Sequence, residues 1–388
     1  MLEAARELDR WIRRGRAFAA ATVTAVDGSA PRQPGATLAV AEDGTAVGSV
    51  SGGCVEGAVY ELCLRALDDG RSLHERFRHS DEDAFAAGLM CGGTVELLIT
   101  PVRADAPGGG VFGAALALAA RGGTGALVRV ADGPADRLGR ALLVHADGHH
   151  EGTLGGPPAL DRTATAEARA LLAAGRTATV TVGAEGGRCG TPLTLLVESA
   201  APPPRMIVFG AIDFAAALVT VGRFLGYHVT VCDARPVFAT AERFPDADEV
   251  VVEWPHRYLA ATRTDARTVL CVLTHDAKFD IPLLIRALAL PAAYIGAMGS
   301  RRTHRDRERR LREAGVDEER LARLHSPIGL DLGARTPQET ALSIAAEIVA
   351  TRHGGTGIPL RGAHTPIHHD PAPHPSWSAS ARSGLRGP

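Results

Sequence analysis

The second half of the chain alternates short apolar runs with amphipathic stretches. Strands that alternate with helices are typical of a parallel sheet covered by helices on both faces. The pattern therefore predicts a Rossmann-like, doubly wound α/β domain over residues 206–354. Five apolar runs predict its buried strands: 205–210, 227–235, 248–254, 267–276 and 292–300.

Two helices of this domain have recognisable beginnings. Asp280 is the predicted N-cap of a helix over 281–290. Thr336, Pro337 and Glu339 have the spacing of N-cap, first position and third position, which predicts a capping box at the start of the closing helix. Gly354 is expected to end that helix.

In the first half, an amphipathic pattern follows the sequence Gly52-Gly53-Cys54. Its apolar positions have the spacing of one helix face, and Gly70 is the expected stop. Cys63 lies on that face, so we interpret it as a core residue. The face consists of Val55, Ala58, Val59, Leu62, Cys63 and Ala66.

Cys54 is the first candidate for chemistry. At the start of a helix it would lie beside free backbone N–H groups, which lower the pKa of a thiol below its free value of about 8.5. Gly52 and Gly53 would let a ligand approach the backbone closely, and Glu56 suits the positive end of the helix dipole. The alternative is that Cys54 is a small residue tolerated after a tight turn.

A glycine pattern repeats before residue 200, at a constant shift of 104 positions. Each copy predicts strand, turn, strand, glycine turn and helix, which indicates an internal duplication. Pro157 and Pro158 stand opposite Gly53 and Cys54, so the second copy lacks the candidate thiol. A chance match in a glycine-rich chain is the alternative. The matched residues are Gly35, Gly44, Gly48 and Gly52 with Gly139, Gly148, Gly152 and Gly156, and Cys91 with Cys189 before the closing strands.

The expected organisation is a first α/β domain over 1–103, with Cys54 and Cys91, and a second α/β half over 104–200. Three prolines within 199–205 indicate a linker. The segment 361–388 is rich in Pro, Ser, Gly and His and is predicted to be a disordered tail. Its histidines could hold a metal, but we interpret them as part of a solvated low-complexity segment: His364, His368, His369 and His374.

The composition of the chain argues against several classes of protein function. The net charge of −2 gives no general attraction to nucleic acid or to an anionic membrane. The six cysteines show no C-x-x-C pair and no iron–sulfur spacing. A charged, amphipathic N-terminus and the lack of an apolar run of about 18 residues favour a cytoplasmic protein with reduced thiols.

The predicted sheet of the second half offers three ligand-binding loops at the carboxyl ends of its strands. In the first, Gly210 follows a strand and opens a helix that begins near Asp213, and Asp233 ends the next strand, where a ribose-binding carboxylate belongs. Ile212 replaces the glycine that lets a pyrophosphate approach. Two interpretations of this loop therefore stay open. It is a site for a nucleotide or NAD(P), or it is a Rossmann-like scaffold whose turn has kept just its structural glycine.

The other two loops carry polar residues. His275 and Asp276 follow the fourth strand and could act in acid–base chemistry or cap the strand end. Gly299 and Ser300 open a helix with Arg301 in its first turn, a combination that suits a phosphate group.

These segments resemble the XdhC/CoxI family, the accessory proteins of xanthine dehydrogenase and related molybdenum hydroxylases. The likeness covers most of residues 15–352, more weakly over 104–200, and FGAIDF departs from the usual Gly-x-Gly turn. The motifs that carry it are GSAPRQPGA, GSVSGGCVE, MCGG, VTVCDARPVFA, ADEVVV, LTHDAKFD, YIGAMGSRRTH and SPIGLDLGARTPQETALSIAAEIVA.

The resemblance implies binding of the molybdenum cofactor (molybdopterin), its presentation for sulfuration with a cysteine desulfurase as partner, and delivery to an apo molybdenum hydroxylase of the xanthine dehydrogenase or CO dehydrogenase type. Such a carrier needs no turnover of its own. Cys54 as thiolate could be a molybdenum ligand or accept persulfide sulfur. Arg32 could pair with the phosphate, and Cys91 is a second thiol candidate.

Two other functions compete with the carrier. An NAD(P)-dependent Rossmann oxidoreductase would use Gly210 and Asp233 but must do without the glycine that Ile212 replaces. A structural interaction module without a cofactor leaves Cys54 and the paired glycine turns without a purpose. The oligomeric state stays open, with a homodimer as one option.

Overall fold

A computed structural model describes residues 1–28, 32–53, 55–78, 93–103, 109–187 and 190–362. The chain folds into two compact units, Met1–Pro202 and Pro203–Pro388. Strand β10 ends at Ala200 and strand β11 begins at Arg205, so the prolines lie in the connection between the units. Within the described ranges, no helix combines the length and the apolar character that a bilayer crossing needs.

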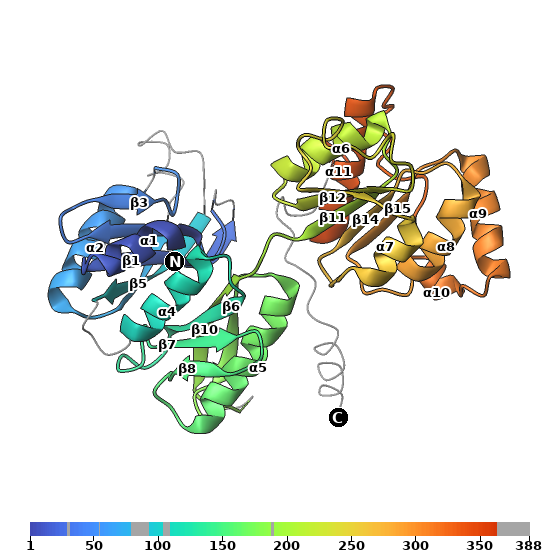
Figure 1. The fold of residues 1–388 in the computed structure, drawn as a ribbon. Coiled ribbons are helices and arrows are strands. Elements are labelled where there is room, and N and C mark those ends of the chain that lie inside the picture. Colours follow the sequence, from blue (N-terminus) through green and yellow to red (C-terminus); the bar gives the residue numbers. More distant parts are fainter. Residues whose placement is uncertain (29–31, 54, 79–92, 104–108, 188–189, 363–388) are drawn as a thin grey trace. The chain divides into compact units, whose positions relative to one another are not determined.

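The first half of the N-terminal unit is a five-stranded antiparallel sheet with the strand order β3-β2-β1-β5-β4 (Figure 1). A short 3₁₀ turn, Leu2–Ala4, precedes it. Its elements are α1 (Ala5–Arg13), β1 (Phe18–Gly28), β2 (Thr37–Ala41), β3 (Ala46–Gly48), α2 (Glu56–Asp69), β4 (Leu73–Arg78) and β5 (Gly93–Val102).

The second half of this unit has the same elements in the same order, and its sheet runs β8-β7-β6-β10-β9. Leu38 pairs with Gly48 in the first copy and Leu142 pairs with Gly152 in the second, a shift of 104 on both strands. This match of order and register is what an internal duplication predicts. The elements are α4 (Gly109–Ala120), β6 (Gly125–Asp132), β7 (Ala141–His145), β8 (His150–Gly152), α5 (Pro158–Ala174), β9 (Ala178–Gly183) and β10 (Pro192–Ala200).

One pair of matched glycines marks where the copies touch. A Cβ at Gly35 would lie 2.7 Å from Cγ2 of Thr177, and a Cβ at Gly139 would overlap Oγ of Ser72. Ser72 and Thr177 both immediately precede the fourth strand of their copy. The two contacts are therefore related by a pseudo-twofold axis, and both sites require a residue without a side chain.

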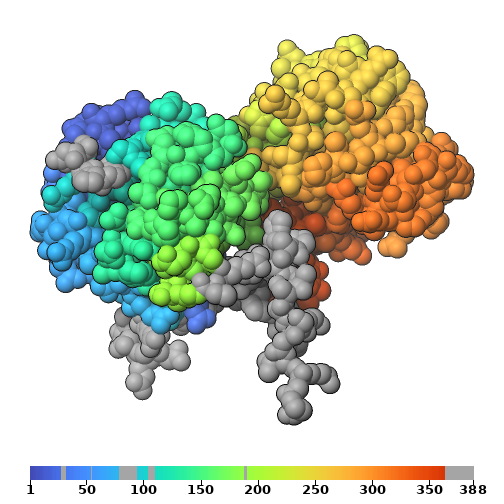
Figure 2. All heavy atoms as spheres, turned by 90° about the horizontal axis from the view of Figure 1, so that it is seen from below, coloured from blue at the N-terminus to red at the C-terminus, as the bar shows by residue number. Residues whose placement is uncertain are grey.

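The two copies pack their sheets against each other, and the space-filling view shows them as one continuous body, blue and green (Figure 2). Helix α2 covers the outer face of the first sheet, and α5 covers the outer face of the second. The shared inner core joins β1 and β2 of one copy to β6 and β7 of the other, with α1 and α4 packed beside it.

A buried polar cluster lies within this contact between the sheets. Arg129 is 0% exposed, and its guanidinium donates to Glu198 at 2.6 Å, to Thr22 at 2.8 Å and to Thr100 at 3.2 Å. The α-ammonium of Met1 also donates to Glu198. Strand register makes Thr22 the counterpart of Arg129, and Thr100 the counterpart of Glu198.

The C-terminal unit is the predicted parallel sheet, with the strand order β13-β12-β11-β14-β15-β16 of a Rossmann fold. Helices α6 and α11 cover one face, and α7, α8 and α9 cover the other (Figure 1). The elements are β11 (Arg205–Phe209), α6 (Asp213–Phe224), β12 (His228–Asp233), β13 (Glu249–Val252), α7 (Pro255–Ala261), β14 (Val269–Val272), α8 (Ala277–Ala287), β15 (Tyr294–Ala297), α9 (Arg301–Glu313), α10 (Glu318–Leu321), β16 (Leu324–His325) and α11 (Pro337–His353), followed by a 3₁₀ turn, Leu360–Gly362.

One helix start of this unit was predicted correctly and one was not. Thr336 and Glu339 form the expected capping box, and Gly354 ends α11 in the left-handed conformation. The prediction that Asp280 caps a helix is wrong, because α8 begins four residues earlier and Asp276 is its N-cap. Asp280 lies inside the helix, buried, and accepts hydrogen bonds from Thr274 and Arg307.

Candidate functional site

The strands that lead to the two candidate thiols end on the same side of the first sheet. Gly28 of β1 pairs with Gly93, the first residue of β5, and Arg78 of β4 pairs with Thr94. Leu38 of β2 pairs with Gly48, from which the chain continues to Gly53. Cys54 and Cys91 themselves lie outside the described residues, so their chemistry stays a prediction.

The loop before α2 is held by the carboxylate of Glu56. It accepts hydrogen bonds from the amides of Ser51, Gly52 and Gly53 at 3.0, 2.9 and 2.8 Å, and from the hydroxyls of Ser49 and Ser51. Burial alone would raise the pKa of Glu56, but these hydrogen bonds outweigh it and lower the pKa to about 2.

This contact occupies the amides of the loop. Those of Gly52 and Gly53 are not free to hold an anion, because both already donate to Glu56. Both glycines are exposed and have positive φ, 81° and 131°, so they remain candidates for close approach of a ligand.

In the second copy, which has no cysteine at this place, a carboxylate also accepts hydrogen bonds from the loop before the helix. Helices α2 and α5 both end at a glycine in the left-handed conformation, Gly70 and Gly175. When the two helices are aligned on these glycines, Asp161 is the counterpart of Glu56. Asp161 accepts from Thr153 at 2.8 Å and from the amide of Leu154 at 3.0 Å. In this copy α5 begins three positions earlier relative to the carboxylate, at Pro158, whereas α2 begins at Glu56 itself.

We expect Glu56→Ala and Asp161→Ala to lower the free energy of unfolding by similar amounts, about 1–3 kcal/mol, since each leaves loop donors without an acceptor. Chemical denaturation of the two variants measures this. A ligand at the first loop would then lose affinity in Glu56→Ala and keep it in Asp161→Ala. Equal ligand affinity in both variants would show that the first loop takes no part in binding.

Arg32 lies beside a cavity of about 590 Å³ within the N-terminal unit. Its guanidinium contacts Glu3 at 2.6 Å, and its buried Nε makes no hydrogen bond within the described part of the chain. The remaining polar lining comes from Gln33 in the loop before β2, from Thr177 and from the end of β10. The lining residues are Leu2, Glu3, Arg32, Gln33, Pro34, Gly35, Ala36, Ala119, Gly122, Gly123, Thr177, Glu198, Ser199, Ala200 and Ala201.

In the C-terminal unit, the carboxylate of Asp233 is already engaged. It accepts from the amide of Ala211 at 2.8 Å and from the guanidinium of Arg235 at 3.0 and 2.9 Å. Burial would raise the pKa of Asp233, but these hydrogen bonds lower it overall. Asp233 thus fixes the turn after Gly210 within the chain, which is not the free carboxylate expected of a ribose site.

The other residues predicted for this unit lie on its surface loops. Gly210 has φ 109°, a conformation that favours glycine. Asp213 is exposed and pairs with Arg243 at 3.4 Å. His275 and Asp276 are exposed, and Asp276 caps the following helix, α8, through the amide of Lys278.

The loop before α9 has the predicted form. Ser300 is the N-cap and accepts from the amide of Thr303 at 3.1 Å, and Gly299 has φ 153°. Arg301 is the exposed first residue of the helix. Phosphate binding by this loop stays a prediction.

Sequence reasoning missed a polar cluster behind β15. The carboxylate of Glu347 accepts from Oη of Tyr294 and from the amide of Gly329 at 2.7 Å, and it lies 3.1 Å from Nδ1 of His325. The rings of Tyr294 and His325 are stacked 4.5 Å apart. The available clue was a carboxylate next to Ile344 and Ile348 on the apolar face of the closing helix.

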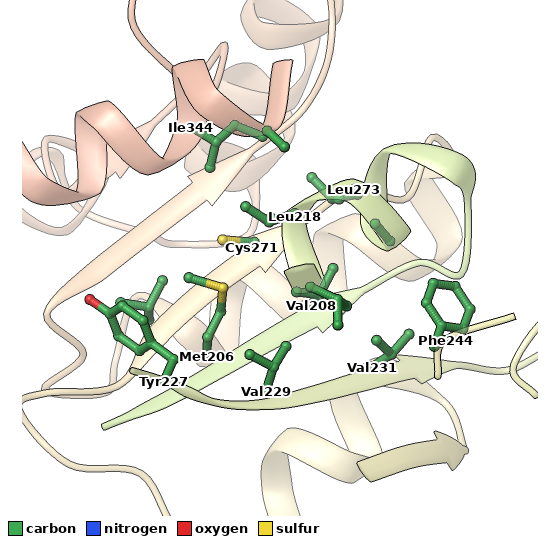
Figure 3. Close-up of a cluster of buried hydrophobic side chains, with 14 of the residues drawn as sticks. Met206, Val208, Leu218, Tyr227, Val229, Val231, Phe244, Cys271, Leu273 and Ile344 are labelled. Atoms are coloured by element: carbon green, nitrogen blue, oxygen red, sulfur yellow. The ribbon is translucent and has the colours of Figure 1, made fainter. Parts of the chain in front are cut away.

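Three described cysteines are core residues. Cys63 of α2 packs against the first sheet, as expected, and burial raises the pKa of its thiol to about 12. Burial also raises the pKa of Cys232 to about 12 and raises that of Cys271. Figure 3 shows Cys271 among the apolar side chains between the sheet and α11. These thiols are unsuited to nucleophilic chemistry.

A duplicated α/β unit followed by a Rossmann unit defines the class of protein. Residues 206–348 match the model of the XdhC Rossmann domain, and residues 11–78 and 118–183 match that of the XdhC and CoxI family. The chain belongs to the XdhC/CoxI family, as its motifs indicated.

Named relatives support this membership. The chain is 25% identical to a Bacillus subtilis protein named as a probable subunit of xanthine dehydrogenase, covering 86% of this chain and 92% of the relative. It is 25% identical to the molybdenum cofactor insertion chaperone PaoD of Escherichia coli, covering 87% and 84%. The uncharacterized protein YqeB of E. coli is 30% identical over 63% of this chain, which spans 46% of that protein.

A solved structure has the same fold over most of its length. The chain matches a Bacillus halodurans protein, described as a xanthine dehydrogenase, with a TM-score of 0.64 and 25% identity. The match covers 89% of this chain and 95% of that one. The likeness therefore includes both units.

Proposed function

We propose that this chain is an accessory protein of molybdenum hydroxylases, which binds the molybdenum cofactor, holds it for sulfuration and delivers it to an apo-enzyme of the xanthine dehydrogenase type. The observation that carries the proposal is family membership across both units. A relative named as a molybdenum cofactor insertion chaperone aligns with 87% of the chain.

The N-terminal unit offers the features that such a cargo needs. The cofactor carries a phosphate, a dithiolene and a thiophilic metal. The cavity beside Arg32 has a volume within the range of small-molecule sites, about 300–1,000 Å³. Arg32 has a buried nitrogen without a hydrogen bond in the described structure, which suits an anionic group.

The exposed glycines before α2 support a role for a thiol next to them in the sequence. Where the second copy has a proline-initiated helical turn, the first has Gly52 and Gly53 in conformations that side chains rarely adopt. We propose that Cys54 at this loop binds molybdenum, or takes the outer sulfur of a desulfurase persulfide while the desulfurase cysteine leaves as thiolate. Cys91 is proposed as the second thiol.

The NAD(P) alternative stays a prediction that Asp233 does not favour. It depended on Asp233 as a ribose ligand, and this carboxylate is already bonded to Ala211 and Arg235. We therefore propose no hydride transfer.

Co-purification tests the proposal. The untagged full chain is expressed in a host that makes the cofactor and in a matched host that lacks its biosynthesis, and pterin and molybdenum are measured in both preparations. We expect a near-stoichiometric pterin signal from the first host and none from the second. Equal, negligible pterin in both, even after incubation with free cofactor, would contradict the proposal.

A further inference from the structure

The hairpin formed by β7 and β8 carries three ligand-type side chains on one face. Its turn closes through the amide of His145, which donates to the carbonyl of His149 at 2.9 Å. His149 therefore faces His145 across the hairpin. Glu151 lies two residues after His149, on the same face, because side chains alternate along a strand. Strand β8 is the exposed edge of its sheet.

The three side chains also point towards one another, which the strand register alone does not require. Nε2 of His145 lies 2.7 Å from Oε1 of Glu151, and the two imidazole rings stack with centroids 4.3 Å apart. One potential ligand atom from each of the three side chains lies within 4.8 Å of the others. Asp147 in the turn adds a negative charge, with Oδ1 3.8 Å from Nδ1 of His149.

The equivalent hairpin of the first copy shows that the fold does not need these residues. It has the same register, with Ala41, Thr45 and Val47 at the corresponding positions. Thr45 and Val47 cannot serve in place of imidazole and carboxylate as a ligand set, yet the hairpin forms. The hairpin therefore does not need the two histidines and the glutamate in order to fold.

We infer that His145, His149 and Glu151 bind a divalent transition-metal ion of the zinc, cobalt, nickel and copper class. Two imidazoles and one carboxylate suit these ions, whereas magnesium and calcium prefer oxygen ligands. Three protein ligands leave a position for water or for a group from another molecule. His149 and Glu151 are 58% and 46% exposed, so their side chains can turn to close the ligand distances around an ion.

Because the ion would join residues on either side of the turn, it should also stabilise the folded hairpin. The site is independent of the proposed cofactor function. It lies on the second copy, which lacks the Cys54 equivalent.

The test is titration of the untagged, chelator-treated full chain with Zn²⁺ by calorimetry and with Co²⁺ by visible absorption. Histidine and carboxylate ligands give cobalt d–d bands without the intense thiolate charge-transfer band that cysteine ligands would add. We expect His149→Ala and His145→Ala to weaken binding at this site by at least about tenfold.

His150→Ala is the matched control. His150 is on the same strand but on the opposite face, where its Nδ1 lies 3.4 Å from Thr165 Oγ1. This variant retains the histidines of the tail, as do the other two, so the tail contributes equally to all titrations. Titrations of His149→Ala and His145→Ala that match those of His150→Ala, or a wild-type chain that binds neither ion, would overturn the inference.

Discussion

Cys54→Ala is expected to reduce activation of an apo molybdenum hydroxylase to background, a loss of about a hundredfold or more, because it removes the proposed sulfur-accepting nucleophile. The thiols of Cys63, Cys232 and Cys271 are buried and have raised pKa values, so they are poor substitutes. The measurement is the activity of the client enzyme after incubation with cofactor-loaded chain and a cysteine desulfurase.

Cys63→Ala provides the control, since the chain offers a buried thiol nine residues further on in the same segment. It should keep full activation and lower the free energy of unfolding by about 1 kcal/mol through loss of packing. Cys54→Ala should show the reverse, with little change in stability. Normal activation by Cys54→Ala would remove this residue from the proposed function.

The largest effect on stability is expected for Glu198→Ala. This variant leaves the guanidinium of Arg129, which is fully buried, and the Met1 ammonium without their carboxylate. An uncompensated buried charge of this kind costs about 3–5 kcal/mol. Denaturation by urea, followed by circular dichroism, measures the change.

The double variant Arg129→Met with Glu198→Met should recover most of the loss, since it removes the carboxylate and the guanidinium together. A double variant as unstable as Glu198→Ala would show that the unpaired Arg129 is not the source of the loss, which then lies with the Met1 ammonium or with the hydrogen bonds to Thr22 and Thr100.

The same pair predicts a pH dependence. Burial alone would raise the pKa of Glu198, but the Met1 ammonium and Arg129 outweigh it and hold the pKa at about 2. A carboxyl whose folded-state pKa is lowered stabilises the protein above its unfolded pKa, about 4.5, and this contribution is lost as the pH falls towards 2. The double variant should lack this part of the acid sensitivity.

Local patterns were sufficient to predict much of the fold. The order of strands and helices in the Rossmann unit follows from apolar runs and caps, and the box at Thr336 and Glu339 is visible in the sequence because both partners are three residues apart. The glycine repeat likewise indicated the duplication. The error at α8 arose because aspartate is a good N-cap residue and both Asp276 and Asp280 were available. Asp280 is instead buried within the helix, where it pairs with Arg307, and this partner is distant in the sequence.

The candidate site was less predictable. The hydrogen bonds of Glu56 to the preceding loop depend on the conformation of its side chain, which turns back towards that loop. From its position in the sequence, we predicted just a favourable interaction of its charge with the helix dipole. The ion pair of Arg129 and Glu198 depends on the pairing of β6 with β10, which no local pattern specifies. The hairpin histidines required the structure as well, because their common face follows from the turn register.

The duplication has a consequence for how the contact between the copies can evolve. In a dimer of separate identical chains every substitution occurs twice, so an arginine at the position of Thr22 would bring a second guanidinium into the same interior. Covalent fusion removes that constraint, and here one half supplies Arg129 and Glu198 while the other supplies the hydroxyls of Thr22 and Thr100. Fusion also keeps the halves together at any dilution, leaving each free to specialise without loss of its neighbour.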